Sequence, residues 1–380
     1  MPPVLMRDSG RTIGVEEEFL LVDPESGHPV ARAREVLAKA AAAPAPAPDA
    51  AIHAELLGTQ VETATGICHT LGELRDQLWQ GRRRIAAAAR AEGLWLLATG
   101  MPVLAGPPVA PSAGDRFDRI ATMYAGAVTD YHSCGCHVHI GVPDRDTAVG
   151  VLNHLAPWLP TLLAVSANSP YGCGVDTGYA SWRMVTQSRF PGSGLAPWFG
   201  SAAAYDEQIE QLVDCGVLAD RHQSFWLARL SPRLPTVELR VADTAGTGTD
   251  AVLQAALSRA LVCTALAELA AGREAAPVNP QLAAAAVWTA ARYGLRGSAV
   301  NLRTERTVDA VHLLDELVTE ISPALEELGD LMTVRAAVST VRANGTGADH
   351  QRRAASGGPL GVVRMLARRT LETPVLIGER

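Results

Sequence analysis

Residues 12–22 read TIGVEEEFLLV, an apolar strand pattern interrupted by three consecutive glutamates. Side chains two residues apart in a strand lie on the same face, roughly 6.6 Å apart along the chain. Glu16 and Glu18 therefore share a face, and most of their neighbours are apolar. Burying ionised carboxylates is costly unless a cation or a donor compensates the charge. The pair predicts either a solvated edge strand or a polar site built on a sheet.

Two further segments repeat this pattern. Residues 134–142, CGCHVHIGV, place His137 and His139 on one face, and residues 235–241, PTVELRV, do the same with Glu238 and Arg240. One such strand alone could be a solvated edge, but three favour a shared floor of carboxylates, imidazoles and arginine. Mg²⁺ takes carboxylate oxygens and bridges them to substrate phosphates. We therefore expect a cation and a phosphate-bearing ligand on this floor.

A fourth acidic segment is ambiguous. Residues 52–65, IHAELLGTQVETAT, contain Glu55 and Glu62, which are an odd number of residues apart. A regular strand would place them on opposite faces, and a bulge at Gly58 would restore the phase. Without that bulge, one of the two glutamates is a surface acid.

The lysine content narrows the possible phosphate chemistry. Lys39 is the only lysine in the 380 residues, and no P-loop sequence is present. A Schiff base to pyridoxal phosphate also needs a placed lysine, whereas Lys39 lies in an Ala-rich helical pattern. Metal ions and arginines would have to neutralise phosphate charge instead.

Charge and hydropathy exclude other partners. The net charge of −7 argues against nucleic-acid binding, and Arg82-Arg83-Arg84 is expected to lie on a solvated helix surface. No run reaches the roughly 18 uninterrupted apolar residues of a membrane span, and residues 1–8 lack the apolar core of a signal peptide. The six scattered cysteines indicate reduced thiols. We expect a cytoplasmic protein without nucleic-acid or membrane partners.

The order of segments predicts an α+β fold. Strands are expected within residues 12–22, 94–98, 134–142 and 224–241, the last as two strands joined by a turn at Ser231-Pro232, and helices at 71–92, 116–131, 147–167 and 205–215. Residues 169–200 are expected to form a loop, and the Pro/Ala-rich residues 41–50 a flexible insertion. Residues 250–380 are expected to be mainly helical. The strands follow too closely for parallel crossovers throughout. We expect residues 1–380 to form one domain with a curved antiparallel sheet, helices on one face and the polar pairs on the concave face.

Other chemistries fit the motifs less well. The sequence Cys134-x-Cys136-His137-x-His139 suggests zinc, but its spacing differs from C-x₂₋₄-C and H-x₃₋₅-H. On a strand, the cysteines and histidines would face opposite sides. It stays open whether His139 is a core histidine whose hydrogen bonds are satisfied within the protein, with only His137 taking part in function. No G-x-S-x-G elbow is present, and a nucleophilic Cys173 between glycines has little support.

Taken together, the motifs resemble those of the glutamate–cysteine ligase type 2 family, in its bacterial carboxylate–amine ligase branch. The similarity covers nearly the whole chain. It rests on GVEEEF (14–19), QVETAT (60–65), GCHVHIG (135–141), SANSP (166–170), DTGYASWR (176–183), PTVELRVAD (235–243) and RYGLRG (292–297). The resemblance implies a fold like glutamine synthetase and the guanidino kinases, in which an antiparallel sheet forms a half-funnel that holds ATP and Mg²⁺ or Mn²⁺.

The resemblance also implies roles for individual residues. The positions matching the family's metal and ATP-phosphate ligands are Glu16, Glu18, Glu55, Glu62, His137 and Glu238. Arg240 and Arg183 would contact phosphate together with His139, and catalysis would rest on Arg240, Arg183 and Glu62. Arg119 or Arg116 would bind the substrate carboxylate, for which a bidentate arginine is well suited.

The implied reaction is ATP-dependent amide formation through an acyl phosphate, with the γ-carboxylate of glutamate and cysteine or another small amine as substrates. Met101 stands where many members carry histidine, and Leu230 where a proline would follow Arg229. The first departure puts the glutamate–cysteine specificity in doubt. A non-catalytic Mg·ATP-binding or metabolite-binding protein and a metal-dependent γ-glutamyl amide hydrolase are the alternatives, and the sequence leaves a homodimer open.

Overall fold

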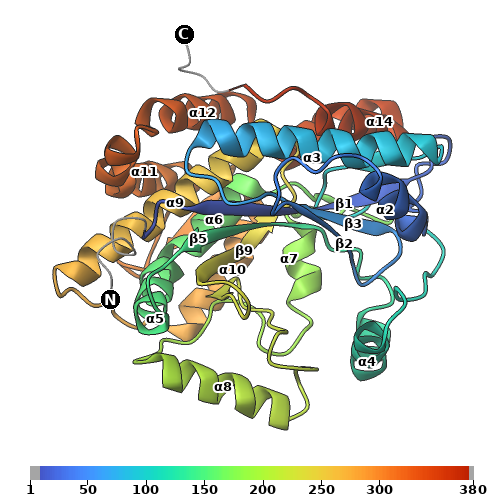
Figure 1. Cartoon of the computed structure of the whole chain (residues 1–380). Helices are drawn as coiled ribbons and strands as arrows, with labels where there is room; N and C mark the ends of the chain where they lie inside the picture. The colour runs from blue at the N-terminus through green and yellow to red at the C-terminus, as the bar shows by residue number, and fades with distance from the viewer. Residues whose placement is uncertain (1–8, 376–380) are drawn as a thin grey trace.

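A seven-stranded sheet runs through the centre of the computed structural model, which describes residues 9–375 (Figure 1). The strand order is β2-β3-β1-β5-β9-β8, and β4 pairs with the end of β1. All pairings in this sheet are antiparallel. The strands are β1 (Ile13–Val22), β2 (Ala51–Ala54), β3 (Gln60–Ala64), β4 (Trp95–Leu97), β5 (Gly135–Gly141), β8 (Ala228–Leu230) and β9 (Thr236–Asp243). The expected antiparallel α+β architecture is confirmed.

Helices form most of the remaining structure. They are α2 (Ala33–Ala41), α3 (Leu71–Ala91), α4 (Asp115–Tyr124), α5 (Arg145–Leu155), α6 (Leu159–Ser166), α7 (Trp182–Gln187), α8 (Ala202–Asp214), α9 (Gly248–Ala270), α10 (Pro280–Tyr293), α11 (Ala310–Leu328), α12 (Leu331–Asn344), α13 (Gly347–Ala354) and α14 (Gly358–Thr370). Two small hairpins complete the described chain: β6 (Tyr171–Gly172) with β7 (Val175–Asp176), and β10 (Ser298–Asn301) with β11 (Arg306–Asp309).

The helices do not all cover one face of the sheet. Helix α3 lies directly above the sheet in Figure 1, with α12 and α14 beyond it, whereas α4, α7 and α8 lie below. The expectation of helices on a single face does not hold for α4, which contributes residues to the polar face. By contrast, Tyr205 and Ile209 of α8 pack into the main hydrophobic core.

Several element boundaries differ from the sequence predictions. The helix expected to reach residue 131 ends at Tyr124, and the one expected over residues 147–167 is split into α5 and α6, with a 3₁₀ turn at Ala156–Trp158 between them. Pro157 and Pro160 explain the break, because proline lacks the amide hydrogen that a helix interior uses. Helix α7 interrupts the expected loop 169–200, and the β10–β11 hairpin interrupts the helical tail.

Arg82 forms a buried ion pair with β1 on the apolar face of the sheet. Glu17 points away from Glu16 and Glu18, and Arg82 of α3 donates hydrogen bonds to both of its carboxylate oxygens. Both side chains are completely buried. The prediction that Arg82 lies on a solvated helix surface is therefore wrong, because it neutralises the one glutamate of the triplet that faces the core.

Two helical stretches, Arg145–Ser166 and Gly248–Ala270, are long and apolar enough to cross a membrane. However, 83% and 67% of their apolar windows are buried inside the protein. Both stretches belong to the hydrophobic core on the apolar face of the sheet, to which α3 also contributes. Their composition is explained by this packing.

Candidate active site

The polar face of the sheet lines a cavity of about 710 Å³. Strands β1, β3, β5, β8 and β9 contribute to its floor, and α4 contributes to its wall. The sequence-predicted residues that line it are Glu16, Glu18, Glu55, Glu62, His137, His139, Glu238, Arg240 and Arg116. The three alternating pairs, drawn from distant parts of the chain, therefore share one cavity.

Strand register brings these side chains together. Glu16 of β1 is paired with His137 of β5, and Glu18 is paired with Glu62 of β3. His139 is paired in turn with Glu238 of β9. Directly paired residues in a sheet point to the same face, so these neighbouring rows of polar side chains all face the cavity.

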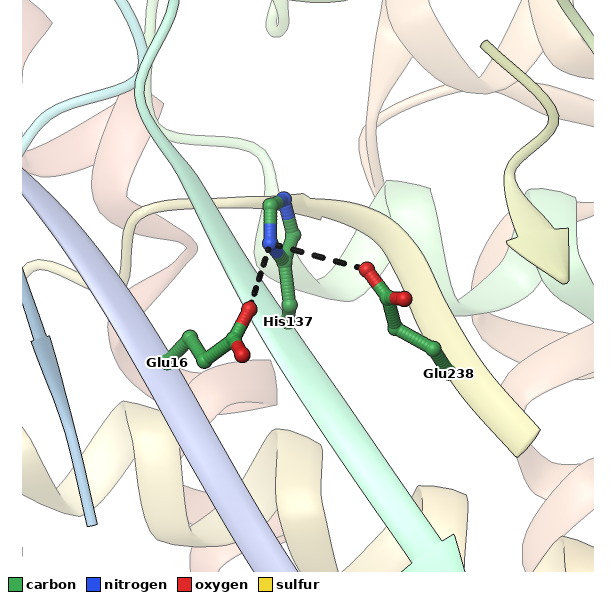
Figure 2. Close-up of side chains that lie close together, drawn as sticks. All are labelled: Glu16, His137 and Glu238. Atoms are coloured by element: carbon green, nitrogen blue, oxygen red, sulfur yellow. Dashed lines mark hydrogen bonds and ion pairs between the residues drawn. The ribbon is translucent and has the colours of Figure 1, made fainter. Parts of the chain in front are cut away.

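His137 is the centre of the arrangement. Its Nδ1 atom lies 3.3 Å from Glu16 Oε2 and 3.9 Å from Glu238 Oε1, and Figure 2 shows both carboxylates directed toward the ring. Its Nε2 atom lies 3.8 Å from Glu18 Oε1. Two groups have ligand atoms within 4.8 Å of one another: Glu16, His137 and Glu238, and Glu18, Glu62 and His137. The two groups share one imidazole.

Glu55 and Glu62 meet through a hairpin rather than within one strand. Glu55 follows β2, the chain reverses over residues 56–59, and Glu62 lies in β3. The single bulged strand considered for this segment is therefore wrong, although the structure does bring the two glutamates together in the cavity. Burial and the charge of Glu18 raise the pKa of Glu55 to about 8. Burial and the charge of Glu55 likewise raise the pKa of Glu62.

Glu16 and Glu238 carry compensated negative charges. Burial opposes their ionisation, but hydrogen bonds from His137 and His139 outweigh it and lower the pKa of Glu16. The charges of Arg229 and Arg240 lower the pKa of Glu238 in the same way. Burial and Arg240 lower the pKa of His137, which favours the neutral imidazole that can donate a lone pair to a metal.

A divalent cation fits this donor set. Burial and neighbouring carboxylates raise the pKa of both Glu55 and Glu62, so an added positive charge would stabilise the ionised pair, and carboxylate oxygens are the ligands preferred by Mg²⁺. An imidazole nitrogen among them also suits Mn²⁺. The residues that could hold one or more ions are Glu16, Glu18, Glu55, Glu62, His137 and Glu238.

A bulge in β9 places Arg240 opposite His137. Cys136 is paired with Ala242 and Val138 with Leu239, so two residues of β9 face the single residue His137. Arg240 Nη1 lies 3.4 Å from His137 Nδ1 and also donates to Glu238. Arg240 therefore reaches the centre of the polar floor.

Sequence reasoning missed Arg229 as a site residue. It is paired with Glu238 across the β8–β9 hairpin, and its Nε atom donates to Glu238 Oε2 over 2.7 Å. It also lines the cavity. The expected turn at Ser231-Pro232 was the nearest signal, but a hairpin centred there would bring Arg229 opposite Leu234. The observed register pairs Leu230 with Val237, which centres the turn between Arg233 and Leu234.

The remaining arginines differ in their placement. Arg116 of α4 lines the cavity and pairs with Asp220 at 3.0 Å, whereas Arg119 is exposed and outside the cavity lining. Arg183 of α7 is buried and is also outside that lining. A Cβ atom at Gly135 would come within 2.5 Å of Arg183 Nη2 and 2.9 Å of His137 Nε2, so the two groups are close neighbours.

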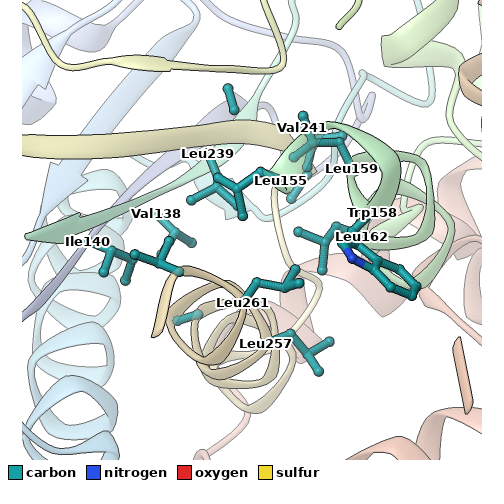
Figure 3. Close-up of a cluster of buried hydrophobic side chains, with 14 of the residues drawn as sticks. Val138, Ile140, Leu155, Trp158, Leu159, Leu162, Leu239, Val241, Leu257 and Leu261 are labelled. Carbon is teal, nitrogen blue, oxygen red and sulfur yellow. The ribbon is translucent and has the colours of Figure 1, made fainter. Parts of the chain in front are cut away.

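Cys136 of the histidine strand faces away from the site, whereas Cys134 precedes β5 and packs with Leu20 in a separate cluster. Cys136 and Val138 lie in the hydrophobic core, where Val138 and Ile140 approach helix α9 in Figure 3. His139 faces the cavity, with Nδ1 3.0 Å from Thr236 Oγ1 and Nε2 3.3 Å from Glu16 Oε1. Within residues 9–375, neither potential metal-binding group includes a cysteine. The prediction from strand alternation, that the cysteines share the face of Val138, therefore agrees with the geometry of Cys136 but not with that of Cys134, whose Sγ atom accepts from Gln60 Nε2 over 3.4 Å.

Comparisons with known proteins place the chain among ligases. The sequence model of glutamate–cysteine ligase family 2 matches residues 12–363. A Saccharopolyspora erythraea protein provisionally named glutamate–cysteine ligase 2-2 is 56% identical over 370 residues, covering 97% of this chain and 94% of the relative.

Two solved structures share the fold at 15% identity. A glutamate–cysteine ligase from Francisella tularensis in complex with AMP aligns with a TM-score of 0.68, covering 96% of this chain and 90% of that one. A bifunctional glutathione synthetase from Pasteurella multocida aligns with a TM-score of 0.67, covering 97% and 53%. These likenesses confirm the expected glutamine synthetase-like sheet, and the sequence matches settle the family. The chain belongs to glutamate–cysteine ligase family 2.

Proposed function

We propose that this protein, an ATP-dependent ligase by family, joins the γ-carboxylate of glutamate to cysteine or another small amine through an acyl phosphate. The observation that carries the proposal is the convergence of four carboxylates on His137, from Glu16, Glu18, Glu62 and Glu238. Such a cluster is suited to cations that accompany a polyphosphate. AMP in the Francisella tularensis ligase supports a nucleotide site on this fold.

The acidic residues would hold Mg²⁺ or Mn²⁺. Glu16, His137 and Glu238 offer one set of ligands, Glu18, Glu62 and His137 offer another, and Glu55 adds an oxygen beside Glu62. Bound metal ions would neutralise the β- and γ-phosphates and polarise the phosphoryl oxygens. The protein's part is to present these oxygens from adjacent strands, which leaves little freedom for the donor atoms to rearrange.

The arginines would stabilise negative charge that develops during phosphoryl transfer. Arg240 extends from β9 to the centre of the floor, and Arg183 lies beside His137, so both guanidinium groups would bind phosphate oxygens near this imidazole. His139 would assist at the phosphate end. Arg116 at the cavity wall would hold the substrate carboxylate.

The proposed chemistry has two steps. The substrate carboxylate oxygen attacks the γ-phosphorus and ADP leaves, which gives an acyl phosphate. The amine nitrogen then attacks the acyl carbon, phosphate leaves, and the nitrogen loses a proton as the amide forms.

ADP release tests this function directly. Purified protein is incubated with ATP, Mg²⁺, glutamate and a panel of amines that includes cysteine, and products are identified by mass spectrometry. We expect amine-dependent ADP formation, with Glu238→Gln and Glu16→Gln lowering it at least about 100-fold. No ADP above background with any amine would refute the proposal. Nucleotide binding without turnover would favour the non-catalytic alternative, and ATP-independent cleavage of γ-glutamyl amides would favour a hydrolase.

We also propose that residues 1–380 act as one ligase domain. The C-terminal helices contact the elements that support the site, since Gln351 of α13 donates to Asn168 and Thr370 of α14 accepts from Arg82. Removal of residues 347–370 is expected to abolish nucleotide binding. Retained binding by the shortened protein would contradict the proposal.

A further inference from the structure

We propose that Asp243 is a positioning residue, which fixes Arg183 beside His137 by anchoring the start of helix α7. This inference rests on the proposed function, because it assigns Arg183 to the phosphates of bound ATP. Asp243 is the last residue of β9, the strand that also carries Glu238 and Arg240. It is completely buried and lies outside the residues that line the cavity.

Two serine hydroxyls connect the Asp243 carboxylate to α7. Ser181 Oγ donates to Asp243 Oδ1 over 2.8 Å, and Ser169 Oγ donates to Asp243 Oδ2 over 2.7 Å. Each hydroxyl then accepts an amide hydrogen of α7: Ser181 Oγ from Met184 and Ser169 Oγ from Arg183 itself. A hydroxyl has one hydrogen, so donation to Asp243 turns its lone pairs toward the helix.

The carboxylate also compensates the charge that it positions. Arg183 Nη1 lies 3.9 Å from Asp243 Oδ1, inside ion-pair range but beyond a hydrogen bond. The other contacts of the guanidinium are weak, with 3.4 Å to the carbonyl of Val241 and 3.3 Å to that of Arg240. Arg183 Nε is buried without a hydrogen-bond partner. A buried cation with so few acceptors is well prepared to bind an anion.

The register of β5 and β9 leaves the required space. Asp243 is paired with Gly135, the residue whose missing Cβ allows Arg183 Nη2 and His137 Nε2 to approach each other. One strand therefore carries a metal-ligand candidate at Glu238, a phosphate contact at Arg240 and, through Asp243, the anchor of a second arginine. The geometry assigns no direct contact with substrate to Asp243.

A double-mutant cycle tests the assignment by binding, without turnover. Calorimetry measures the Kd of a nonhydrolysable ATP analogue with Mg²⁺ for wild type, Asp243→Asn, Arg183→Met and the double variant. The two hydroxyls donate to different carboxylate oxygens, and an asparagine replaces one of these oxygens by an NH₂ donor. Asp243→Asn is therefore expected to weaken analogue binding about tenfold. In the Arg183→Met background the same change is expected to alter Kd less than about twofold. AMP, which lacks the β- and γ-phosphates, should bind all four proteins alike.

Controls separate positioning from general damage. Asp330→Asn breaks another buried pair, with Arg259 at 2.5 Å, and should lower thermal stability without changing the analogue Kd. If Asp243→Asn does not fold, Ser181→Ala serves in its place, with an expected weakening of about threefold that also disappears without Arg183. Equal weakening in both backgrounds, or none in either, would overturn the proposal.

The outcome is distinguishable from failure of the proposed function. A wild-type protein that binds the analogue but never forms ADP would refute ligation, and the cycle would still show whether Asp243 acts through Arg183. A wild-type protein that does not bind the analogue would overturn both proposals, because Arg183 would then have no phosphate to meet.

Discussion

The three consecutive glutamates of β1 should respond differently to mutation. Glu17 faces Arg82 in the core, and both side chains are fully buried. Glu17→Gln leaves the guanidinium without its countercharge, although Arg82 keeps hydrogen bonds to the carbonyls of Ala245 and Thr370. Removing one partner of a buried ion pair costs roughly 3–5 kcal/mol. Glu17→Gln should therefore act mainly on stability.

The expected shift can be measured by thermal unfolding. Unfolding entropy of about 2.1 cal/mol/K per residue gives roughly 0.8 kcal/mol/K for this chain, so the midpoint should fall by about 4–6 °C. At a temperature where the variant is folded, analogue binding should stay within about threefold of wild type, because Glu17 points away from the cavity. Arg82→Met should produce a similar loss of stability.

Glu62→Gln is the matched comparison. It removes one member of a buried carboxylate pair whose ionisation is opposed by burial and by Glu55. We expect the metal-free protein to keep or gain stability, by up to about 1 kcal/mol, while Mg²⁺-dependent nucleotide binding is lost. The argument fails if Glu17→Gln unfolds within about 1 °C of wild type, or if Glu62→Gln is the less stable of the two.

Three further predictions concern space, substrate binding and pH. Gly135→Ala should push Arg183 away from His137 and weaken binding of the ATP analogue about tenfold. Gly357→Ala is the control, because no atom lies near its added methyl group, and it should leave the Kd unchanged. Equal Kd values for the two variants would contradict this prediction. Arg116→Ala should raise the KM for the carboxylate substrate about tenfold. Arg119 is exposed outside the cavity, so Arg119→Ala should leave this KM within twofold of wild type. The reverse pattern would assign the carboxylate contact to Arg119 instead. Burial and the charges of Arg369 and Arg353 lower the pKa of His350 to about 4. As the pH falls below about 6.5, the His350 imidazole therefore takes up a proton in the unfolded chain before it does so in the folded protein. The free energy of unfolding should fall between pH 6.5 and 4 by at most about 3 kcal/mol, and by less where water screens the ring. Urea unfolding of a His350→Gln variant checks this origin, and the same loss of stability in that variant would refute it.

Much of the site was predictable because strand geometry is local. Side chains at i and i+2 share a face whatever the strand pairs with, and this suffices for the pairs Glu16/Glu18, His137/His139 and Glu238/Arg240. The same rule separates Cys136 from His137. Family resemblance then added Arg183, Glu55 and Glu62 to the proposed residues.

The predictions failed where the position of a side chain depended on residues far away in the sequence. Arg82 lies in a basic run typical of a solvated surface, yet its burial depends on Glu17, which is 65 residues away in the chain. Glu55 and Glu62 could not be phased without the hairpin that joins them. No role was predicted for Arg229 or Asp243, because their partners are defined by the pairing of β8 with β9 and by the docking of α7.

The amino-acid sequence by itself determined the kind of elements, the polar and apolar faces of each strand, and the family. Only the tertiary structure decided that His137 lies between two sets of carboxylates, that Arg183 lies beside it, and that Asp243 reaches α7 through two serines. The physical reason is the range of the interactions. Alternation along a strand follows from backbone geometry, whereas convergence depends on register, a bulge and helix docking, which burial and charge compensation select across the whole chain.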